Sequence, residues 1–214
     1  MTALGQIVAA MGRSLRALTE PTPGNRNGRS YAVTLLTPIE PGRTAALTEV
    51  LRGFGTRECS PLAKLPDVHF ARWIVIDQLR TDWPGAPEPP PRLRSAYLMF
   101  SADVTAGNGV EALPHTFFAD LAERIPDEAD AVWSHCRGYP GVAPSAGFVR
   151  FLAASQVDAH LYYAAHPDVT VGEIRRALRL REALAAFVLE HQDATPAALK
   201  DEYLRASESW LSSS

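Results

Sequence analysis

The sequence contains little cysteine and has no strong charge of either sign. Its two cysteines, Cys59 and Cys136, lack the C-x-x-C spacing of metal and redox sites, and a chain of 214 residues does not need a disulfide. We therefore expect both to be small buried hydrophobic residues. The 21 basic and 24 acidic residues give a formal net charge of −3, which predicts no general attraction to nucleic acid or to a membrane surface.

Long apolar runs and common catalytic motifs are also missing from the sequence. No run reaches the 18 or more apolar residues of a membrane span, and the first residues lack the basic start of a secretion signal, so we expect a cytoplasmic protein. The chain has no H-E-x-x-H, G-x-G-x-x-G, P-loop or G-x-S-x-G segment. Its six histidines form no close ligand pair, so the sequence predicts no metal site.

The composition is that of an ordinary globular protein, with 46% hydrophobic and 21% charged residues. Its length fits one domain with terminal extensions. Residues 1–29 are expected to form an amphipathic helix followed by a linker rich in proline and glycine, residues 30–192 the main domain, and residues 193–214 a C-terminal helix. Apolar residues of the first helix recur at helical spacing and are expected to pack on a partner subunit or on the back of the domain.

Within the main domain, segments of strand and helix character alternate in a recognisable order. β-Branched content and length predict strands at 31–37, 68–77, 95–101 and 131–136. Helical spacing predicts helices at 43–55 and 111–125, the second of them stopped by Pro126. The order β-α-β-β-α-β predicts an α+β protein of the ferredoxin-like type, an antiparallel sheet with helices on one face.

Beyond this repeat, the chain continues with further predicted elements. These are a helix at 144–155, a strand at 157–164, a long helix from residue 170 and a last helix from Pro196. The long helix begins with a capping box, Thr170 to Glu173, and proline suits the first position of the last helix.

The strand at 68–77 is apolar on both faces, which indicates that neither side of the sheet is simply exposed to water. Because the helices cover only one face, something else must cover the other. A second sheet, from a symmetric partner or from the chain's own extra strand, is the simplest cover. Two sheets packed in this way leave a space that fits a small apolar ligand.

Four segments resemble the dimeric α+β barrel superfamily, and the resemblance extends over residues 31–191. They are Ser60–Ala63, His69–Trp73, Tyr97–Ser101 and Trp133–Gly141. The superfamily includes cofactor-free monooxygenases, chlorite dismutases, dye-decolorising peroxidases and haem-degrading enzymes. The resemblance implies a homodimer formed by two sheets. It transfers no catalytic residue to this chain and leaves the cofactor unknown, with bound haem as an open alternative.

Individual residues suggest where chemistry could take place. His69 and His160 are the candidate catalytic acid–base residues, although each also fits a purely structural histidine. In a regular strand Arg72 points to the opposite face from His69. The candidate ligand-binding residues, for which core packing is the alternative, are Arg72, Trp73, Tyr97, His135 and Tyr163.

Two functions remain open from the sequence. The first is a small-molecule enzyme of the oxidoreductase or isomerase type, acting on an apolar ligand in a pocket on the sheet face. The second is a non-catalytic ligand-binding or assembly module, which the apolar stripes of the terminal helices favour. A closed pocket containing polar groups supports the enzyme. Open apolar stripes near the termini support the module.

Overall fold

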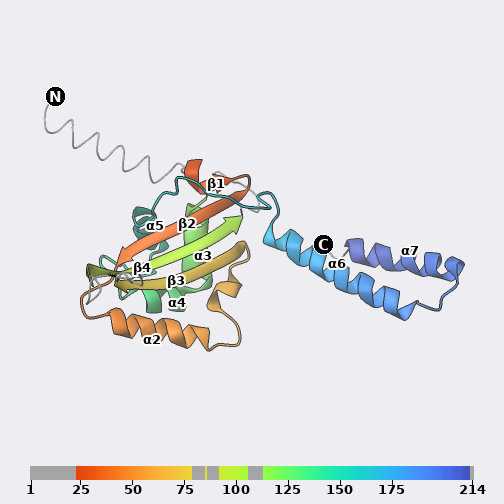
Figure 1. Cartoon of the computed structure of the whole chain (residues 1–214), viewed down its shortest axis with the longest axis horizontal. Coiled ribbons are helices and arrows are strands. Elements are labelled where there is room, and N and C mark those ends of the chain that lie inside the picture. Colours follow the sequence, from red (N-terminus) through yellow and green to blue (C-terminus); the bar gives the residue numbers. More distant parts are fainter. Residues whose placement is uncertain (1–22, 79–84, 86–91, 106–112, 213–214) are drawn as a thin grey trace, which may run out of the picture. The chain divides into compact units, whose positions relative to one another are not determined.

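The computed structural model describes residues 23–78, 85, 92–105 and 113–212 (Figure 1). Contacts divide the chain into two compact units, Met1–Asp168 and Val169–Ser214, which are described one at a time. The predicted N-terminal helix and nearly all of the proline-rich connection before residue 92 lie outside the described residues. The boundary predicted after residue 192 falls inside the second unit.

The described part of the first unit forms one antiparallel sheet of four strands in the order β1-β2-β4-β3. The strands are β1 (Arg26–Asn27), β2 (Ser30–Pro38), β3 (Val68–Gln78) and β4 (Arg92–Thr105). The three long strands confirm the predictions at 31–37, 68–77 and 95–101. Phe100, on the central strand β4, lies opposite both Leu35 and Trp73. A sheet with separate helices confirms the α+β class.

Helices cover one face of this sheet, and Figure 1 shows α3, α4 and α5 behind the strands. The helices are α2 (Thr44–Gly55), α3 (His115–Arg124), α4 (Pro126–Trp133) and α5 (Ser145–Ala154), and two 3-10 turns are η1 (Pro23–Asn25) and η2 (Pro61–Lys64). Aromatic rings fill the core between the layers. The ring centroid of Trp133 lies 5.7 Å from that of Phe100 and 5.5 Å from that of Phe148. Each of these three side chains is fully buried.

The predicted strand at 131–136 is wrong, because residues 131–133 are the last turn of α4. Only Cys136 pairs with the sheet, through an isolated bridge to Ile39. Pro126 ends α3 as predicted, but it also begins α4, where proline at the first position and the acidic Asp127 and Glu128 favour a helix. The second half of the predicted split β-α-β repeat therefore lacks its strand.

The predicted strand at 157–164 is also wrong, since this segment has no regular structure. It pairs with β2 only at its start, where Gln156 bridges to Leu35. Further along, the segment contacts η1 instead of β2, because the Asn25 side chain accepts a hydrogen bond from the backbone N–H of Ala159. Because η1 and β1 occupy the rest of the β2 edge, the segment cannot extend the sheet.

The second unit is an antiparallel hairpin of two helices, α6 (Val171–Glu190) and α7 (Pro196–Ser212). The predicted capping box is confirmed: Thr170 Oγ1 accepts from the backbone N–H of Glu173 at 3.1 Å, and the Glu173 carboxylate accepts from the Thr170 N–H at 2.7 Å. Phe187 joins the two helices, with its ring 6.0 Å from that of Tyr203 and 5.7 Å from that of Trp210.

Candidate functional site

The sheet face opposite the helices is apolar toward one end and mixed toward the other, where Phe70 and Ala32 lie in the same row as Asp103. Strand alternation assigns it these residues: Ser30, Ala32, Thr34, Leu36 and Pro38 from β2; Phe70, Arg72, Ile74 and Ile76 from β3; Tyr97, Met99, Ser101, Asp103 and Thr105 from β4. We call this the open face. The predicted apolar character of this face is confirmed at one end, where Leu36, Met99 and Ile74 form a row of half-buried side chains.

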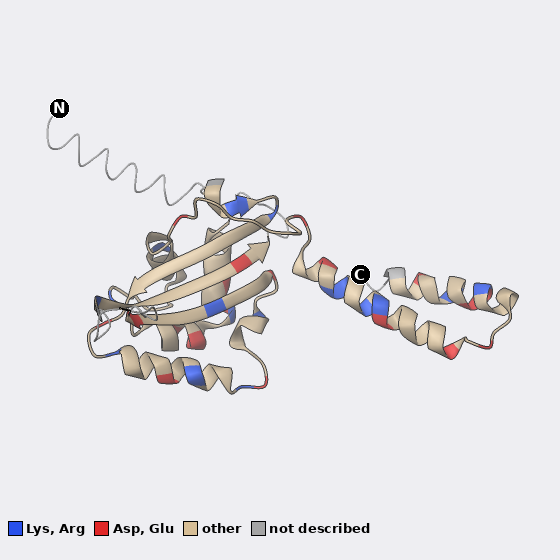
Figure 2. Ribbon diagram, in the orientation of Figure 1, with Lys and Arg blue, Asp and Glu red and all other residues tan. Residues whose placement is uncertain are grey.

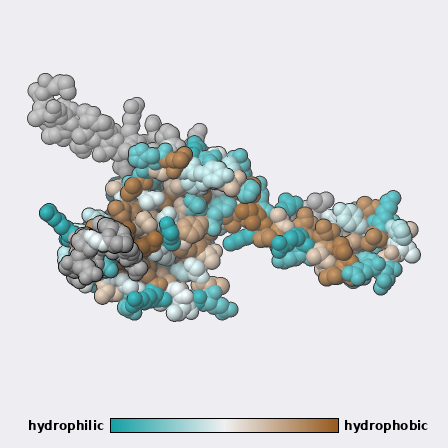
Figure 3. Space-filling view, in the orientation of Figure 1, coloured by the Kyte–Doolittle hydropathy of each residue, from teal (hydrophilic) through white to brown (hydrophobic). Residues whose placement is uncertain are grey.

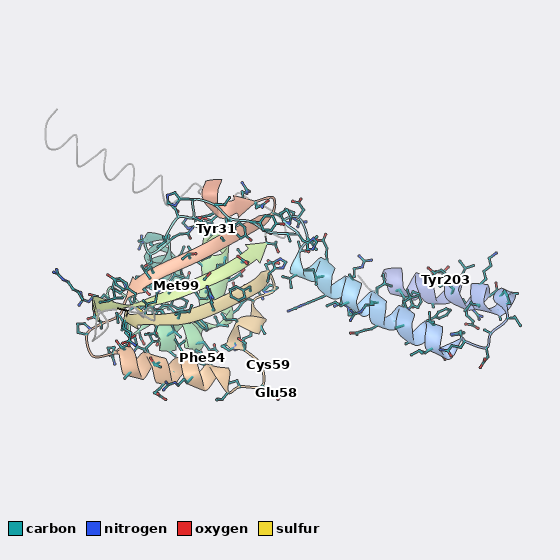
Figure 4. All side chains as sticks on the ribbon, in the orientation of Figure 1. Tyr31, Phe54, Glu58, Cys59, Met99 and Tyr203 are labelled. Atoms are coloured by element: carbon teal, nitrogen blue, oxygen red, sulfur yellow. The ribbon has the colours of Figure 1, made fainter. Side chains whose placement is uncertain are left out.

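Figure 3 shows hydrophobic colouring over the sheet on this side, and Figure 4 labels Met99 near the middle of the strands. The next row along the strands is polar. Thr34, Ser101 and Arg72 lie directly opposite one another across β2, β4 and β3. Arg72 is exposed, with its guanidinium carbon 5.6 Å from the centre of the Phe70 ring. Two hydroxyls and a guanidinium in one row offer hydrogen-bond donors for an anionic group.

At the mixed end of the open face, a bulge in β3 sets the position of His69. Val68 pairs with Val104 and Phe70 with Asp103, so His69 has no residue directly opposite it. Its ring Nε2 lies 3.0 Å from the hydroxyl of Thr105. Bulges often redirect a side chain in this way, and the regular alternation assumed from the sequence does not apply at His69.

His69 belongs to a compact polar cluster with Asp103, Thr105 and Tyr162. The Tyr162 hydroxyl donates a hydrogen bond to the Asp103 carboxylate. Burial raises the pKa of the Asp103 carboxyl, while the charge of His69 and the Tyr162 hydrogen bond limit the rise. Burial and the neighbouring Asp103 charge raise the pKa of Tyr162. Groups with altered pKa that lie side by side can exchange protons with a ligand.

Tyr162 lies beside the sheet because the segment 157–167 is hydrogen bonded to the start of β2. The carbonyl of Pro167 accepts hydrogen bonds from the Arg29 N–H and the Ser30 hydroxyl, each at 3.0 Å. Gly28, with a φ of +57°, permits this close approach of the two segments, because a Cβ at this position would lie 2.5 Å from an Asp168 carboxylate oxygen. Sequence reasoning missed Tyr162, because no local pattern pairs it with a strand far earlier in the chain.

The predicted catalytic histidines are not brought together. Among the described residues, His69 interacts with the hydroxyl of Thr105 and with the carboxylates of Asp67 and Asp103. His160 has an exposed side chain and is not among them.

The predicted aromatic residues also lie apart. Trp73 packs in the core beside Phe100, at 5.5 Å, on the side that the helices cover. Tyr97 lies on the open face, and Tyr163 is 79% exposed. The three rings therefore do not line one pocket, and only Tyr97 and Arg72 of the predicted ligand-binding residues share the open face.

His135 is buried just after α4, where its backbone carbonyl accepts from the Glu40 N–H at 2.9 Å. Its ring Nδ1 has no hydrogen-bond partner within the described ranges. Burial and the charge of Arg43 lower the pKa of His135. This surrounding is that of a neutral histidine inside the fold, away from the open face.

The described ranges contain neither a cluster of metal ligands nor a membrane-spanning helix. No group of three His, Cys, Asp or Glu side chains there could hold a metal ion. No helix within those ranges is long and apolar enough to cross a membrane. Comparison of the chain with protein-family models, curated proteins and solved structures finds no match.

Proposed function

We propose that the first unit is a binding module for a small apolar molecule that carries an anionic group. The apolar part of the ligand lies on Leu36, Met99 and Ile74, and its anionic group lies beside Arg72. The observation that carries this proposal is the order of residues on the open face, where an apolar row is followed directly by a row of hydrogen-bond donors.

The expected affinity is modest because the face is open. Covering about 200 Å² of apolar surface contributes roughly 5 kcal/mol. A charge-assisted hydrogen bond to the guanidinium adds about 1.5–3 kcal/mol. Part of this gain is lost to the reduced freedom of the bound ligand, so dissociation constants between about 10 μM and 1 mM are expected.

Decanoate is a suitable probe, and titration calorimetry of the full chain measures its binding. Arg72→Gln removes the charged donor and is expected to weaken binding about tenfold or more. Arg150→Gln is the matched control, because Arg150 is exposed on α5, on the helix side of the sheet. Decanol, which has the same chain without the charge, is expected to bind Arg72→Gln and the native protein equally. Unchanged decanoate affinity in Arg72→Gln would disprove the proposal.

A second candidate function is acid–base catalysis on the same ligand, favoured by the cluster of His69, Asp103 and Tyr162. Asp103 lies two residues along β4 from Ser101, which is about 7 Å from the donor row. The oxidoreductase or isomerase activity predicted from the sequence would use these groups, with Asp103 and Tyr162 in place of His160. Turnover of small carboxylates by the native protein, lost in Asp103→Asn with decanoate binding retained, would establish this function.

The sheet-to-sheet homodimer of the dimeric α+β barrel superfamily is a competing use of the same face. It would cover Met99 with a second copy and exclude decanoate. Decanoate affinity that falls steadily as protein concentration rises would favour this homodimer over the small ligand.

A further inference from the structure

The helical hairpin leaves most of its apolar surface uncovered. Thirteen large hydrophobic side chains are exposed within the described ranges, and nine of them belong to α6 and α7. The only hydrophobic residues that the second unit buries are Val171 and Phe187, within the described part. Two helices alone cannot form a sufficient core, so this hairpin needs a partner to cover its stripe.

The exposed stripe of α6 has the spacing of a helix–helix interface. Ile174, Leu178, Arg181, Ala185 and Val188 follow one another at intervals of four, three, four and three residues, which is the a/d spacing of a coiled coil. Leu178 is 42% exposed and Val188 is 55% exposed. This stripe differs from the side of α6 on which Phe187 contacts α7.

The C-terminal half of the stripe borders a shallow, mostly apolar depression. Its lining residues are Arg181, Leu184, Ala185, Val188 and Leu189. In Figure 3 patches of hydrophobic colour lie among hydrophilic ones on the hairpin. The small Ala185 makes room for a larger side chain from a facing helix.

Charge along α6 favours one orientation of a second copy. Residues 171–181 carry four arginines, at 175, 176, 179 and 181, and one acidic residue, Glu173. Residues 182–190 carry Glu182 and Glu190 and no basic residue. Figure 2 shows this separation of blue from red along the helix. Two copies in antiparallel orientation place each basic half against the partner's acidic half, whereas parallel copies place like charges together.

We propose that α6 pairs with α6 of a second copy, antiparallel, about a two-fold axis that passes between residues 181 and 182. Two hairpins joined in this way place the two α6 helices side by side at the centre, with each α7 on the outer side of its own α6. In this register Leu178 of one copy faces Ala185 of the other, so that a large side chain meets a small one. Arg181 faces Glu182 of the other copy, and the symmetry creates this ion pair twice.

Sedimentation velocity of the full chain tests the register by charge reversal. The native protein is expected to be a dimer at micromolar concentration. Arg181→Glu or Glu182→Arg alone places two like-charged pairs at the axis and is expected to weaken dimerisation at least tenfold. The double variant, Arg181→Glu with Glu182→Arg, restores opposite charges and is expected to recover the dimer. Recovery also shows that the single variants did not fail by unfolding.

Arg179→Glu is the matched control, because position 179 is turned about 200° around the helix from Arg181. It is expected to remain a dimer. Circular dichroism checks that every variant keeps its helix content.

Several results would overturn the proposal. One is a native protein that stays monomeric over the whole concentration range, and another is a double variant that fails to recover the dimer while its helix content is native. A third is a dimer lost in Met99→Asp and kept in Arg181→Glu, because this would place the interface on the open face. A monomer that dimerises only after residues 1–18 are deleted would show that the chain's own N-terminal segment covers the stripe.

Discussion

Two neighbouring residues in β4 provide a direct test of which sheet face is internal. Leu98 is completely buried and faces the helices, whereas Met99 is half buried on the open face. Replacing a buried leucine with alanine removes its packing and leaves a cavity, which typically costs 2–5 kcal/mol, and we expect about 3 kcal/mol for Leu98→Ala. Met99→Ala is expected to cost about 1 kcal/mol or less, because part of the methionine side chain already contacts water.

Urea unfolding, followed by tryptophan fluorescence, measures this difference, since Trp73 and Trp133 lie in the same core. A loss of 3 kcal/mol lowers the melting temperature by roughly 6–12 °C in a chain of this size. Met99→Ala is expected to weaken decanoate binding as well, and Leu98→Ala is not, provided that the fold is intact. A Met99→Ala variant as unstable as Leu98→Ala would show that the open face is internal, and the proposed ligand site would be wrong.

Two further predictions concern buried groups. The pKa of His135 is lowered in the folded state, so the unfolded chain binds more protons and the free energy of unfolding is expected to fall as pH falls below about 6.5. The His135→Gln variant is expected to lose this part of the pH dependence. Urea unfolding between pH 8 and pH 5 measures it. An identical pH profile in both proteins would contradict this. Cys59 is exposed, whereas Cys136 is buried beside the Thr37 hydroxyl and burial raises the pKa of its thiol. In the native protein only the Cys59 thiol is therefore expected to react rapidly with a disulfide reagent, whereas both thiols are expected to react rapidly in urea. Rapid reaction of both thiols without urea would refute this prediction.

The exposure of Cys59 corrects the expectation that both cysteines are buried. Cys136 fits that expectation because it follows α4 and bridges to Ile39 in the core. The surroundings of Cys59, in the loop between α2 and η2, carry no periodic pattern from which its burial could be read.

Local patterns in the sequence were sufficient for several elements. β-Branched content and length were enough to predict β2, which alternates buried and half-buried residues from Tyr31 to Pro38. The capping box at Thr170 fixed the start of α6, because the two hydrogen bonds involve residues only three positions apart. Interactions of such short range depend only on neighbouring residues, so they can be predicted without a structure.

The end of α4 shows where local patterns fail. A run of six residues with apolar character fits either a buried strand or the last turn of a buried helix. The packing of Trp133 against Phe100 and Phe148 accompanies the helical form. Those partners lie in β4 and α5, so residues 131–136 alone could not determine the outcome.

The sequence by itself determined the α+β class, the three long strands, the apolar row of the open face and the two helices of the hairpin. Tertiary structure alone decided the composition of the candidate site. The bulge at His69 depends on the register between two strands, and Tyr162 reaches Asp103 only because Pro167 is fastened to the start of β2. Contacts between residues distant in the chain depend on how whole elements pack, and short-range periodicity carries no information about that packing.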